Sequence, residues 1–355
     1  MLFRKRVPVK KTMKKIGKTN FSRGFTLIEL MAATAIMIIL VMFVTNIAVN
    51  MLRIYDKTIA TLSTHADSAM VLDPVQDDLR AASMPQDGKY WFEVRYDSGS
   101  LDNLKKAAVP EFYFFSHPSD RIRREKNSTD TLPGDLCAIS YKIAHTSPFG
   151  SKYTSNAGNL VYGFYRAVLN ASDTFEYAVP YIIGQKSTSE SSCIPSKFWK
   201  GSDQITDPSD STGYTASAWR TEMQNFLIDG IVNFSVFFWF DDFSDGKRKI
   251  VTVSDSTTVQ RLRNVYPDTT ILTFDKTLFA SMGAIVLDEN FSGKTSGALR
   301  SAEVSITVLS PDGKEILAAK QESAGTGKID EDTFEDILTE YGETFSRSCE
   351  LFGGS

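Results

Sequence analysis

The chain has 355 residues, a formal net charge of −4 and 42% hydrophobic residues, which is ordinary for a protein that buries a core and excludes a largely disordered chain. Residues 1–24 hold nine Lys and Arg residues and no acid, so the net charge divides into +9 for this segment and −13 for the rest. A basic stretch can bind nucleic acid. A basic head directly before an apolar segment instead follows the positive-inside pattern of membrane insertion, so no nucleic-acid partner is expected.

An uncharged apolar stretch follows the basic head, from Leu30 to Leu52. It is long enough to cross a hydrocarbon core, which takes about 20 residues, and a segment in lipid must be helical. A secretory signal peptide has a shorter apolar region that ends at a small-residue cleavage site, and this stretch has neither feature. We therefore expect one membrane-spanning helix over residues 25–52 in the inner membrane, with a cytoplasmic N-terminus and a periplasmic body.

One carboxylate, Glu29, directly precedes this stretch. A carboxylate within a membrane helix costs about 2.5–3.5 kcal/mol on insertion scales, and such residues commonly have a function. The alternative is that Glu29 reaches water at the membrane interface.

The nine residues from Ser22 to Leu30 read SRGFTLIEL. With the basic head and the membrane-length stretch, they resemble the processing motif of prepilin precursors. The resemblance implies that a prepilin peptidase removes residues 1–24 after Gly24, that Phe25 becomes the N-methylated N-terminus, and that Glu29 pairs with the N-terminus of a neighbouring subunit. The leader is longer than usual, so we expect translation from either Met1 or Met13, which give the same mature protein.

After Arg53 the pattern becomes that of an amphipathic helix, expected over residues 53–84. Its apolar stripe predicts one face packed on a globular head. The Asp73-Pro74 pair predicts a kink or a restart of the helix, because proline is tolerated in a first turn and Asp can cap it. The stripe consists of Leu62, Ala66, Ala69, Leu72 or Val75, Leu79 and Ala82.

From Lys89 the sequence favours strands, because runs of aromatic and β-branched residues alternate with turn formers. A hairpin is expected with Glu303–Leu309 and Glu315–Leu317 joined at Pro311–Lys314. A helix near 330–341 and a strand near 345–352 follow. The fold class is α+β and pilin-like: a long helix, half of it transmembrane, packed on the antiparallel sheet of a head over residues 89–355, with a polar insertion near 184–218. The other expected strands are Tyr90–Tyr96, Glu111–Phe115, Leu136–Tyr141, Leu160–Leu169 and Ile231–Phe240.

The length of the chain and the elements expected near its C-terminus resemble those of the J-type minor pseudopilins of type II secretion. The segments Leu72–Arg80 and Gly342–Arg347 are also similar to the Verrucomicrobia prepilin-type "cassette protein C" group. These resemblances imply a minor pseudopilin assembled near the tip of a secretion filament, with other minor and major pseudopilins, the inner-membrane assembly platform and membrane lipid as partners. A minor pilin of a type IV pilus is the alternative, and the N-terminal motif does not separate the two.

A signal-anchored periplasmic hydrolase is the rival class. The three histidines are His65 on the polar side of the amphipathic helix, and His117 and His145 in loop-like contexts. No nucleophile elbow, zinc-helix motif or phosphate loop accompanies them. The sequence therefore predicts a structural protein without a catalytic residue.

The acidic cluster Asp241, Asp242 and Asp245 supplies the hard oxygen ligands that calcium accepts. Its spacing is not that of an EF-hand loop, and a hairpin turn with Gly246 at positive φ is the favoured interpretation. No other cofactor is expected.

The three cysteines, Cys137, Cys193 and Cys349, match no metal motif. They allow one disulfide and one thiol in an exported body, or buried apolar thiols, and the pairing stays open.

Overall fold

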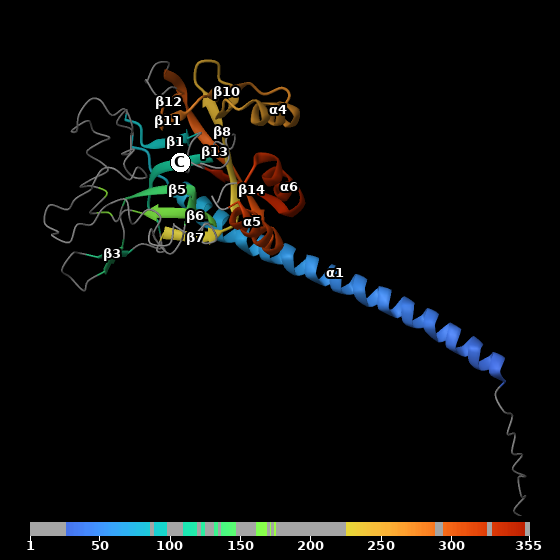
Figure 1. Cartoon of the computed structure of the whole chain (residues 1–355). Helices are drawn as coiled ribbons and strands as arrows, with labels where there is room; N and C mark the ends of the chain where they lie inside the picture. The colour runs from blue at the N-terminus through green and yellow to red at the C-terminus, as the bar shows by residue number, and fades with distance from the viewer. Residues whose placement is uncertain are drawn as a thin grey trace, which may run out of the picture. The chain divides into compact units, whose positions relative to one another are not determined.

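The computed structural model describes residues 26–85, 89–97, 109–118, 122–124, 131–133, 136–146, 161–168, 171, 174, 225–287, 294–324 and 329–351. The chain divides into two compact units, Met1–Lys57 and Thr58–Ser355. Helix α1, Leu27–Arg80, contributes to both units (Figure 1). The expected leader 1–24 and the polar insertion near 184–218 lie outside the described residues.

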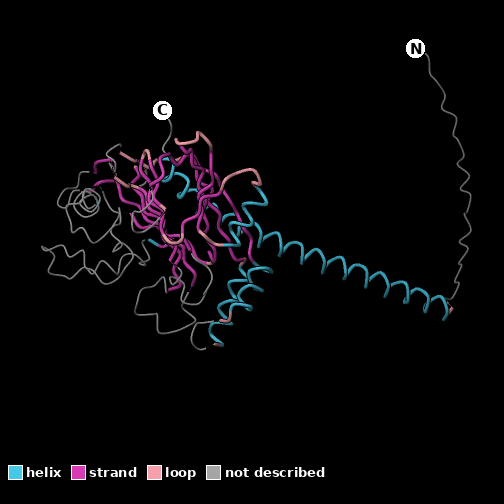
Figure 2. Tube along the Cα trace, turned by 90° about the horizontal axis from the view of Figure 1, so that it is seen from above, coloured by secondary structure: helices cyan, strands magenta, loops and turns pink. Residues whose placement is uncertain are grey.

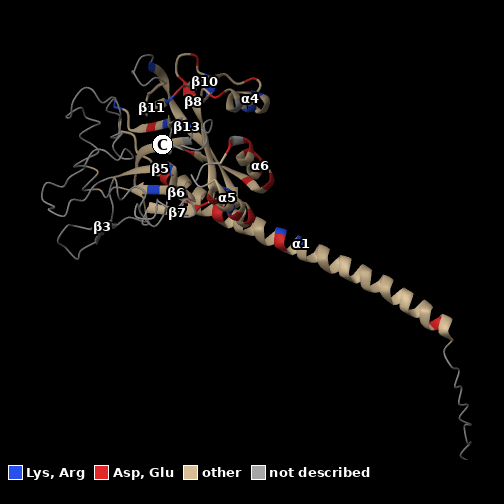
Figure 3. Ribbon diagram, viewed as in Figure 1, with Lys and Arg blue, Asp and Glu red and all other residues tan. Residues whose placement is uncertain are grey.

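The first unit is described only through α1. Its large apolar side chains are exposed, and none of the most apolar stretch of α1 is buried. Figure 3 shows the N-terminal half of α1 almost without charged residues. The helix is thus long and apolar enough to cross a membrane.

The second unit is built on one large sheet, joined in the described residues by three further helices and a small two-stranded sheet. The strands of the large sheet are β1 (Phe92–Asp97), β2 (Val109–Ser116), β5 (Cys137–Thr146), β6 (Val161–Val168), β7 (Phe226–Asp229), β8 (Ile231–Asp242), β9 (Arg248–Val253), β10 (Ile271–Phe274), β11 (Thr277–Ser281), β12 (Ala284–Val286), β13 (Lys294–Leu309) and β14 (Gly342–Glu350). The remaining elements are β3 (Ile122–Arg124), β4 (Thr131–Pro133), α4 (Ser256–Val265), α5 (Pro311–Ser323) and α6 (Glu331–Tyr341).

The strand order is β10-β9-β8-β13-β12-β11-β1-β2-β5-β6-β7, with β14 also paired to β13. All described pairings are antiparallel except that of β9 with β10. The long strand β13 pairs with β12 through Lys294–Ser296 and with β8 and β14 further on, so it links two halves of the sheet. Figure 2 shows the strands gathered in one body.

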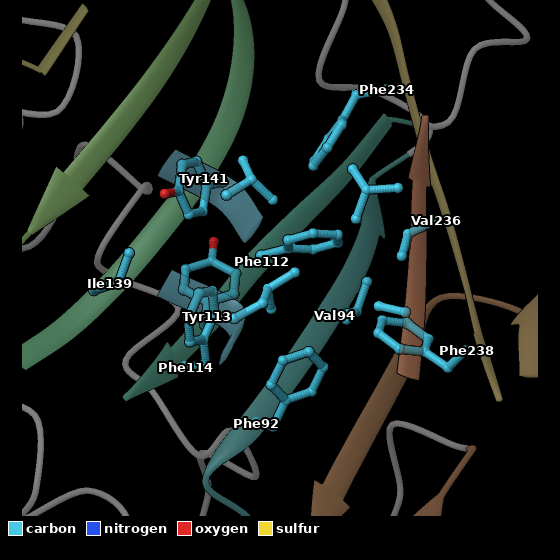
Figure 4. Packing of buried hydrophobic residues seen from close by; sticks show 14 of the residues in the cluster. Phe92, Val94, Phe112, Tyr113, Phe114, Ile139, Tyr141, Phe234, Val236 and Phe238 are labelled. Carbon is cyan, nitrogen blue, oxygen red and sulfur yellow. The ribbon is translucent and has the colours of Figure 1, made fainter. Parts of the chain in front are cut away.

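These two halves meet through aromatic side chains. Phe92 of β1 lies 5.6 Å from Phe238 of β8, and Phe112 of β2 lies 4.8 Å from Phe234, measured between ring centroids (Figure 4). Alternate residues of each strand point to this side, as the two-residue period of a strand requires. These aromatic residues belong to one buried hydrophobic core. The predicted α+β fold, a long helix packed on a mostly antiparallel sheet, is confirmed.

Within the second unit, α1 packs on the sheet through one face. Leu72, Val75, Leu79 and Ala82 are buried as predicted. The first half of the predicted stripe is wrong, because Leu62 and Ala66 are exposed and Ala69 is only half-buried. In this part of α1 the face that packs on the head is polar: its buried residues are Thr64 and Ser68, and Thr64 donates a hydrogen bond to Glu343.

A restart at Asp73-Pro74, one of the two predicted alternatives, is also wrong, because α1 continues through Pro74 to Arg80. A kink at this pair stays a prediction. Proline removes one helical N–H donor. Asp73 does not cap a new helix, since its carboxylate pairs with Arg347 of β14.

The predicted hairpin at Pro311–Lys314 is wrong as well. Helix α5 begins at Pro311, and the Ser310 hydroxyl accepts a hydrogen bond from the Gly313 N–H at 3.2 Å. Proline suits a first helical turn as well as a β-turn, so Ser-Pro-Asp-Gly here starts a helix. The five expected strands and the helix near 330–341 are confirmed as β1, β2, β5, β6, β8 and α6.

Candidate assembly site

The N-terminus of α1 is closed by a capping box. The Thr26 N–H donates to Glu29 Oε2 at 3.0 Å, and the Thr26 hydroxyl donates to the same oxygen at 3.1 Å. The Glu29 N–H donates to the Thr26 hydroxyl at 3.3 Å. This reciprocal arrangement satisfies helix-terminal donors and places an anion where the helix dipole favours one. The T-x-x-E spacing that signals a capping box is visible in the sequence at Thr26 and Glu29, but it was not among the predicted features.

The Glu29 side chain is exposed beside the large apolar residues Leu27 and Ile28. Gly24 and Phe25, the predicted processing residues, lie outside the described residues. Within one chain, the carboxylate therefore stabilises its own helix end and remains accessible to a second molecule.

A buried ion pair attaches the C-terminal end of α1 to the sheet. Asp78 accepts hydrogen bonds from Arg166 of β6 at 2.7 Å and 2.8 Å, and from the hydroxyl of Tyr141 of β5. All three side chains are buried. Burial and the Asp78 charge raise the pKa of Tyr141 well above its usual value, so its hydroxyl stays a donor. Asp78 belongs to the segment Leu72–Arg80 that carries the narrower resemblance, but no local pattern predicts its role.

Polar contacts also attach the segment of α1 around Thr64 and Asp67 to β14 and α5. The Thr64 hydroxyl donates to Glu343 of β14 at 2.8 Å. Lys314 of α5 donates to Asp67 at 3.1 Å and to Asp229 of β7 at 2.8 Å. Burial alone would lower the pKa of Lys314, but the hydrogen bonds and charges of Asp229 and Asp67 outweigh it and raise that pKa.

Strand β14 lies along α1. Arg347 pairs with Asp73 and donates to Gln76 Oε1 at 3.3 Å, and the Gln76 amide donates to the Ser348 carbonyl at 3.2 Å. The segments Leu72–Arg80 and Gly342–Arg347, which carry the narrower resemblance, are therefore in contact. Asp73, Gln76 and Arg347 make this contact, whereas Asp78 of the first segment pairs with Arg166 of β6.

The histidines lie apart in the described part of the chain. His65 is exposed and packs edge-on against Phe345, and His117 follows β2. His145 was expected in a loop, which is wrong: it lies in β5, stacks on Tyr162 and shares a hydrogen bond with Gln321 of α5 at 2.9 Å. Burial lowers the pKa of His145 to about 4. This environment holds a neutral, structural imidazole.

The acidic cluster forms the turn between β8 and β9. Gly246 has φ +67, and Asp242 accepts a hydrogen bond from the Ser244 N–H at 2.8 Å, which confirms the hairpin-turn interpretation. Lys249 pairs with both Asp242 and Asp245, at 2.7 Å and 2.8 Å. Hydrogen bonds from Lys249 and Ser244 lower the pKa of Asp242 to about 2. Asp241 pairs with Arg248 and Arg300, so protein cations already neutralise the carboxylates a calcium ion would need.

Cys349 is a buried free thiol, which excludes a bridge between it and Cys137. Burial raises the pKa of Cys349 to about 11, and its sulfur lies 3.6 Å from the Ala302 carbonyl oxygen. Cys137 is buried in β5, and Cys193 lies outside the described residues.

Comparison with known proteins bears on the N-terminal region. Residues 19–45 match the family profile described as the prokaryotic N-terminal methylation motif. No curated protein and no solved structure matches the chain. The matched motif, which includes the start of the exposed apolar helix α1, supports a membrane-anchored, type IV pilin-like precursor that a prepilin peptidase processes and that assembles with other pilins.

Proposed function

We propose that this chain is a minor pseudopilin, a structural subunit that is cut after Gly24, methylated on Phe25 and assembled near the tip of a type II secretion pseudopilus or a related filament. The observation that carries the proposal is the methylation motif at residues 19–45, which runs directly into an apolar helix of membrane-spanning length. No enzymatic role is proposed, because the polar groups of the described head hold its own elements together.

Glu29 is the proposed assembly residue. Cleavage after Gly24 would create a cationic N-terminus at Phe25. In an apolar helix bundle a lone cation and a lone carboxylate are each costly, and pairing lowers the cost of both. An incoming subunit would offer Glu29 to the N-terminus of the subunit above it. Thr26 holds the carboxylate at the helix end within the single chain, which supports a role of this charge at that end of the helix.

The presence of Glu29 also supports a position below the extreme tip. A topmost subunit has no N-terminus above it to pair with, so a carboxylate there would stay unmatched. The proposed position is therefore within a minor-pseudopilin complex, with at least one subunit distal to this one.

A minor pilin of a type IV pilus is the second candidate, because the same motif serves both filaments. Co-purification separates them. Secretin and secretion-platform proteins recovered with the chain would favour the secretion pseudopilus, and a retraction ATPase would favour the pilus.

The test of the proposal is incorporation of Glu29 variants in cells. Glu29→Ala should be cleaved and membrane-bound, since removing a charge eases insertion. Its recovery with filament partners should fall by about a hundredfold or more, because breaking a buried pair costs about 3–5 kcal/mol and each 1.4 kcal/mol is tenfold.

Glu29→Gln separates pairing from capping. Gln also completes a capping box but carries no charge. The proposal expects both variants to assemble poorly, while Glu322→Ala at an exposed position of α5 behaves as wild type. Normal assembly of Glu29→Gln would show that Glu29 acts only on its own helix.

A further inference from the structure

One face of the sheet formed by β8, β13 and β14 carries two adjacent rows of uncharged polar residues. Residues that lie directly opposite one another in neighbouring strands share a face of the sheet, and each row takes one residue from each of the three strands. This surface, the hydroxyl platform, consists of Ser235, Ser305 and Ser346 in one row and Asn233, Thr307 and Thr344 in the other.

The hydroxyl platform is open to solvent. Asn233, Thr344 and Ser346 are exposed, and Ser305 between them is half-buried. The residues that alternate with them along the strands, such as Ile306, point to the core on the other side of the sheet.

Hydrogen bonds between strands hold the hydroxyl groups of the platform. The Oγ atoms of Ser235 and Ser305 are 2.7 Å apart, and the Oγ1 atoms of Thr307 and Thr344 are 2.9 Å apart. A hydroxyl has one donor and two acceptor lone pairs, so one such bond leaves each group able to bind a ligand. The platform therefore presents an ordered pattern of donors and acceptors.

The composition of the platform is unusual for a solvated sheet face. Antiparallel sheets commonly expose one polar face, but protein surfaces are rich in charged residues. Charged residues make up 23% of the chain, and none of the six platform residues is charged. None of the exposed large hydrophobic residues of the described chain belongs to the platform either. The platform thus offers hydrogen bonds without apolar area or charge.

A carboxylate and an aromatic ring border the platform on the same face. Glu303, half-buried, occupies the next row along β13, and Trp239 lies opposite Ser301 in the row after it. The half-buried indole of Trp239 packs edge-on against Tyr266, with 5.2 Å between the ring centroids. Hydroxyl and amide groups beside an aromatic ring are the groups that bind sugars, because they exchange hydrogen bonds with sugar hydroxyls while the ring packs against C–H groups.

We propose that the hydroxyl platform binds a neutral polysaccharide, the glycan strand of the cell wall. An uncharged surface suits a chain of sugar hydroxyl and acetamido groups, and Glu303 beside it disfavours phosphate-rich polymers by charge repulsion. The inference goes beyond the proposed function and rests on it only for the compartment, since a head exported across the inner membrane lies where the cell wall is. Binding would hold the head against the wall that a filament must pass.

Co-sedimentation of the membrane-extracted protein with purified cell-wall sacculi tests the ligand. The protein should sediment with the sacculi at physiological salt. Soluble glycan strands released from sacculi by an amidase should compete, and the stem peptides from the same digest should not. Absence of sedimentation, competition by the stem peptides alone, or equal retention on cellulose would overturn the proposal.

Variants locate the binding surface. Asn233→Ala/Ser346→Ala should weaken sedimentation about tenfold, because it removes two groups that would hydrogen-bond the glycan. Ser323→Ala/Thr339→Ala, which removes two exposed hydroxyls of α5 and α6, is the matched control and should sediment like the parent. All four positions are exposed, so both variants should keep the unfolding midpoint of the parent. Parent-like sedimentation of the platform variant would overturn the proposal.

Two further readouts separate this inference from the proposed function. The platform variant should be processed and recovered with filament partners like the parent, because the platform acts on the wall and not on assembly. Loss of that recovery together with unchanged sedimentation would assign the platform to assembly and overturn glycan binding. A parent chain that keeps its leader would contradict the proposed function, whereas a processed parent that fails to sediment overturns only the platform.

Discussion

The carboxylate of Asp78 in α1 and the guanidinium of Arg166 in β6 form a two-point ion pair, with Nε and Nη2 at 2.7 Å and 2.8 Å from the two carboxylate oxygens. The pair lies at the buried contact between the helix and the sheet, where neither side chain is more than 8% exposed. Apolar contacts tolerate sliding, whereas a two-point pair is directional. The pair therefore fixes the register of α1 on the sheet.

Replacing Asp78 by Ala should lower the free energy of unfolding by about 3–5 kcal/mol, because it leaves a buried guanidinium without this carboxylate. Asp73→Ala is the matched control: it removes the exposed pair with Arg347 and should cost at most about 1 kcal/mol. Urea unfolding of a chain that begins at Thr58 measures both values. Equal losses would contradict a special role of the Asp78–Arg166 pair.

A chain that begins at Thr58 should be folded, since residues Thr58–Ser355 form a compact unit. A chain that begins at Lys89 lacks Val71, Leu72, Val75 and Leu79, all of them buried against the sheet, and should expose that face and aggregate. Thermal unfolding and light scattering compare the two chains. If the shorter chain is as stable and as monodisperse, this part of α1 does not belong to the core of the head.

The sequence predicts the strands well where aromatic runs alternate, as in β1 and β8, since periodicity is a local property. The strands β9 to β12 were missed because they are short and lie close together. Ser310-Pro311-Asp312-Gly313 was misread because the same residues start a turn or a helix, and only the rest of the chain decides between them. The pairing of Asp78 with Arg166, 88 positions apart, has no local signal.

The prediction that the apolar stripe of α1 is buried is wrong in its first half for a different physical reason. Burial of apolar residues is a rule for a chain that works alone, and Leu62 and Ala66 break it while Thr64 and Ser68 are buried. The N-terminal motif, in contrast, could be recognised from the sequence because its residues are contiguous in the chain.

The head should lose stability as the pH falls from about 6.5 to about 4. Burial lowers the pKa of His145 to about 4 in the folded chain, so over this range the unfolded chain binds more protons at this site. The contribution of His145 is fully present above pH 6.5 and is of order 1–3 kcal/mol.

Urea unfolding at pH 7.5 and pH 4.5 checks this contribution, with His145→Asn as the reference that subtracts all other titrating groups. The stability difference between parent and variant should shrink at the lower pH. A difference independent of pH would show that His145 titrates normally in the folded head.

The Cys349 thiol should be inert in the folded protein, because it is 3% exposed and burial raises its pKa to about 11. Maleimide labelling at pH 7.5 followed by peptide mapping should leave Cys349 unmodified in the native chain and modify it in urea. Rapid labelling of the native chain would contradict the burial of β14 against β13.

Replacing Gly24 by Leu should leave the leader attached, because a side chain there obstructs the extended backbone that a peptidase cleft must admit. Gly17→Leu, within the leader but away from the cleavage position, is the control and should be processed normally. Immunoblotting resolves the two chain lengths, and normal processing of Gly24→Leu would place the cleavage site elsewhere.

The mass of the N-terminal peptide of the membrane-extracted protein tests the central claim most directly. The account predicts a peptide that begins at Phe25 and carries one methyl group on its α-amino nitrogen. Detection of only the full-length chain, or of an N-terminus beyond residue 45, would contradict a pilin-like precursor and favour an ordinary membrane anchor or a signal peptide.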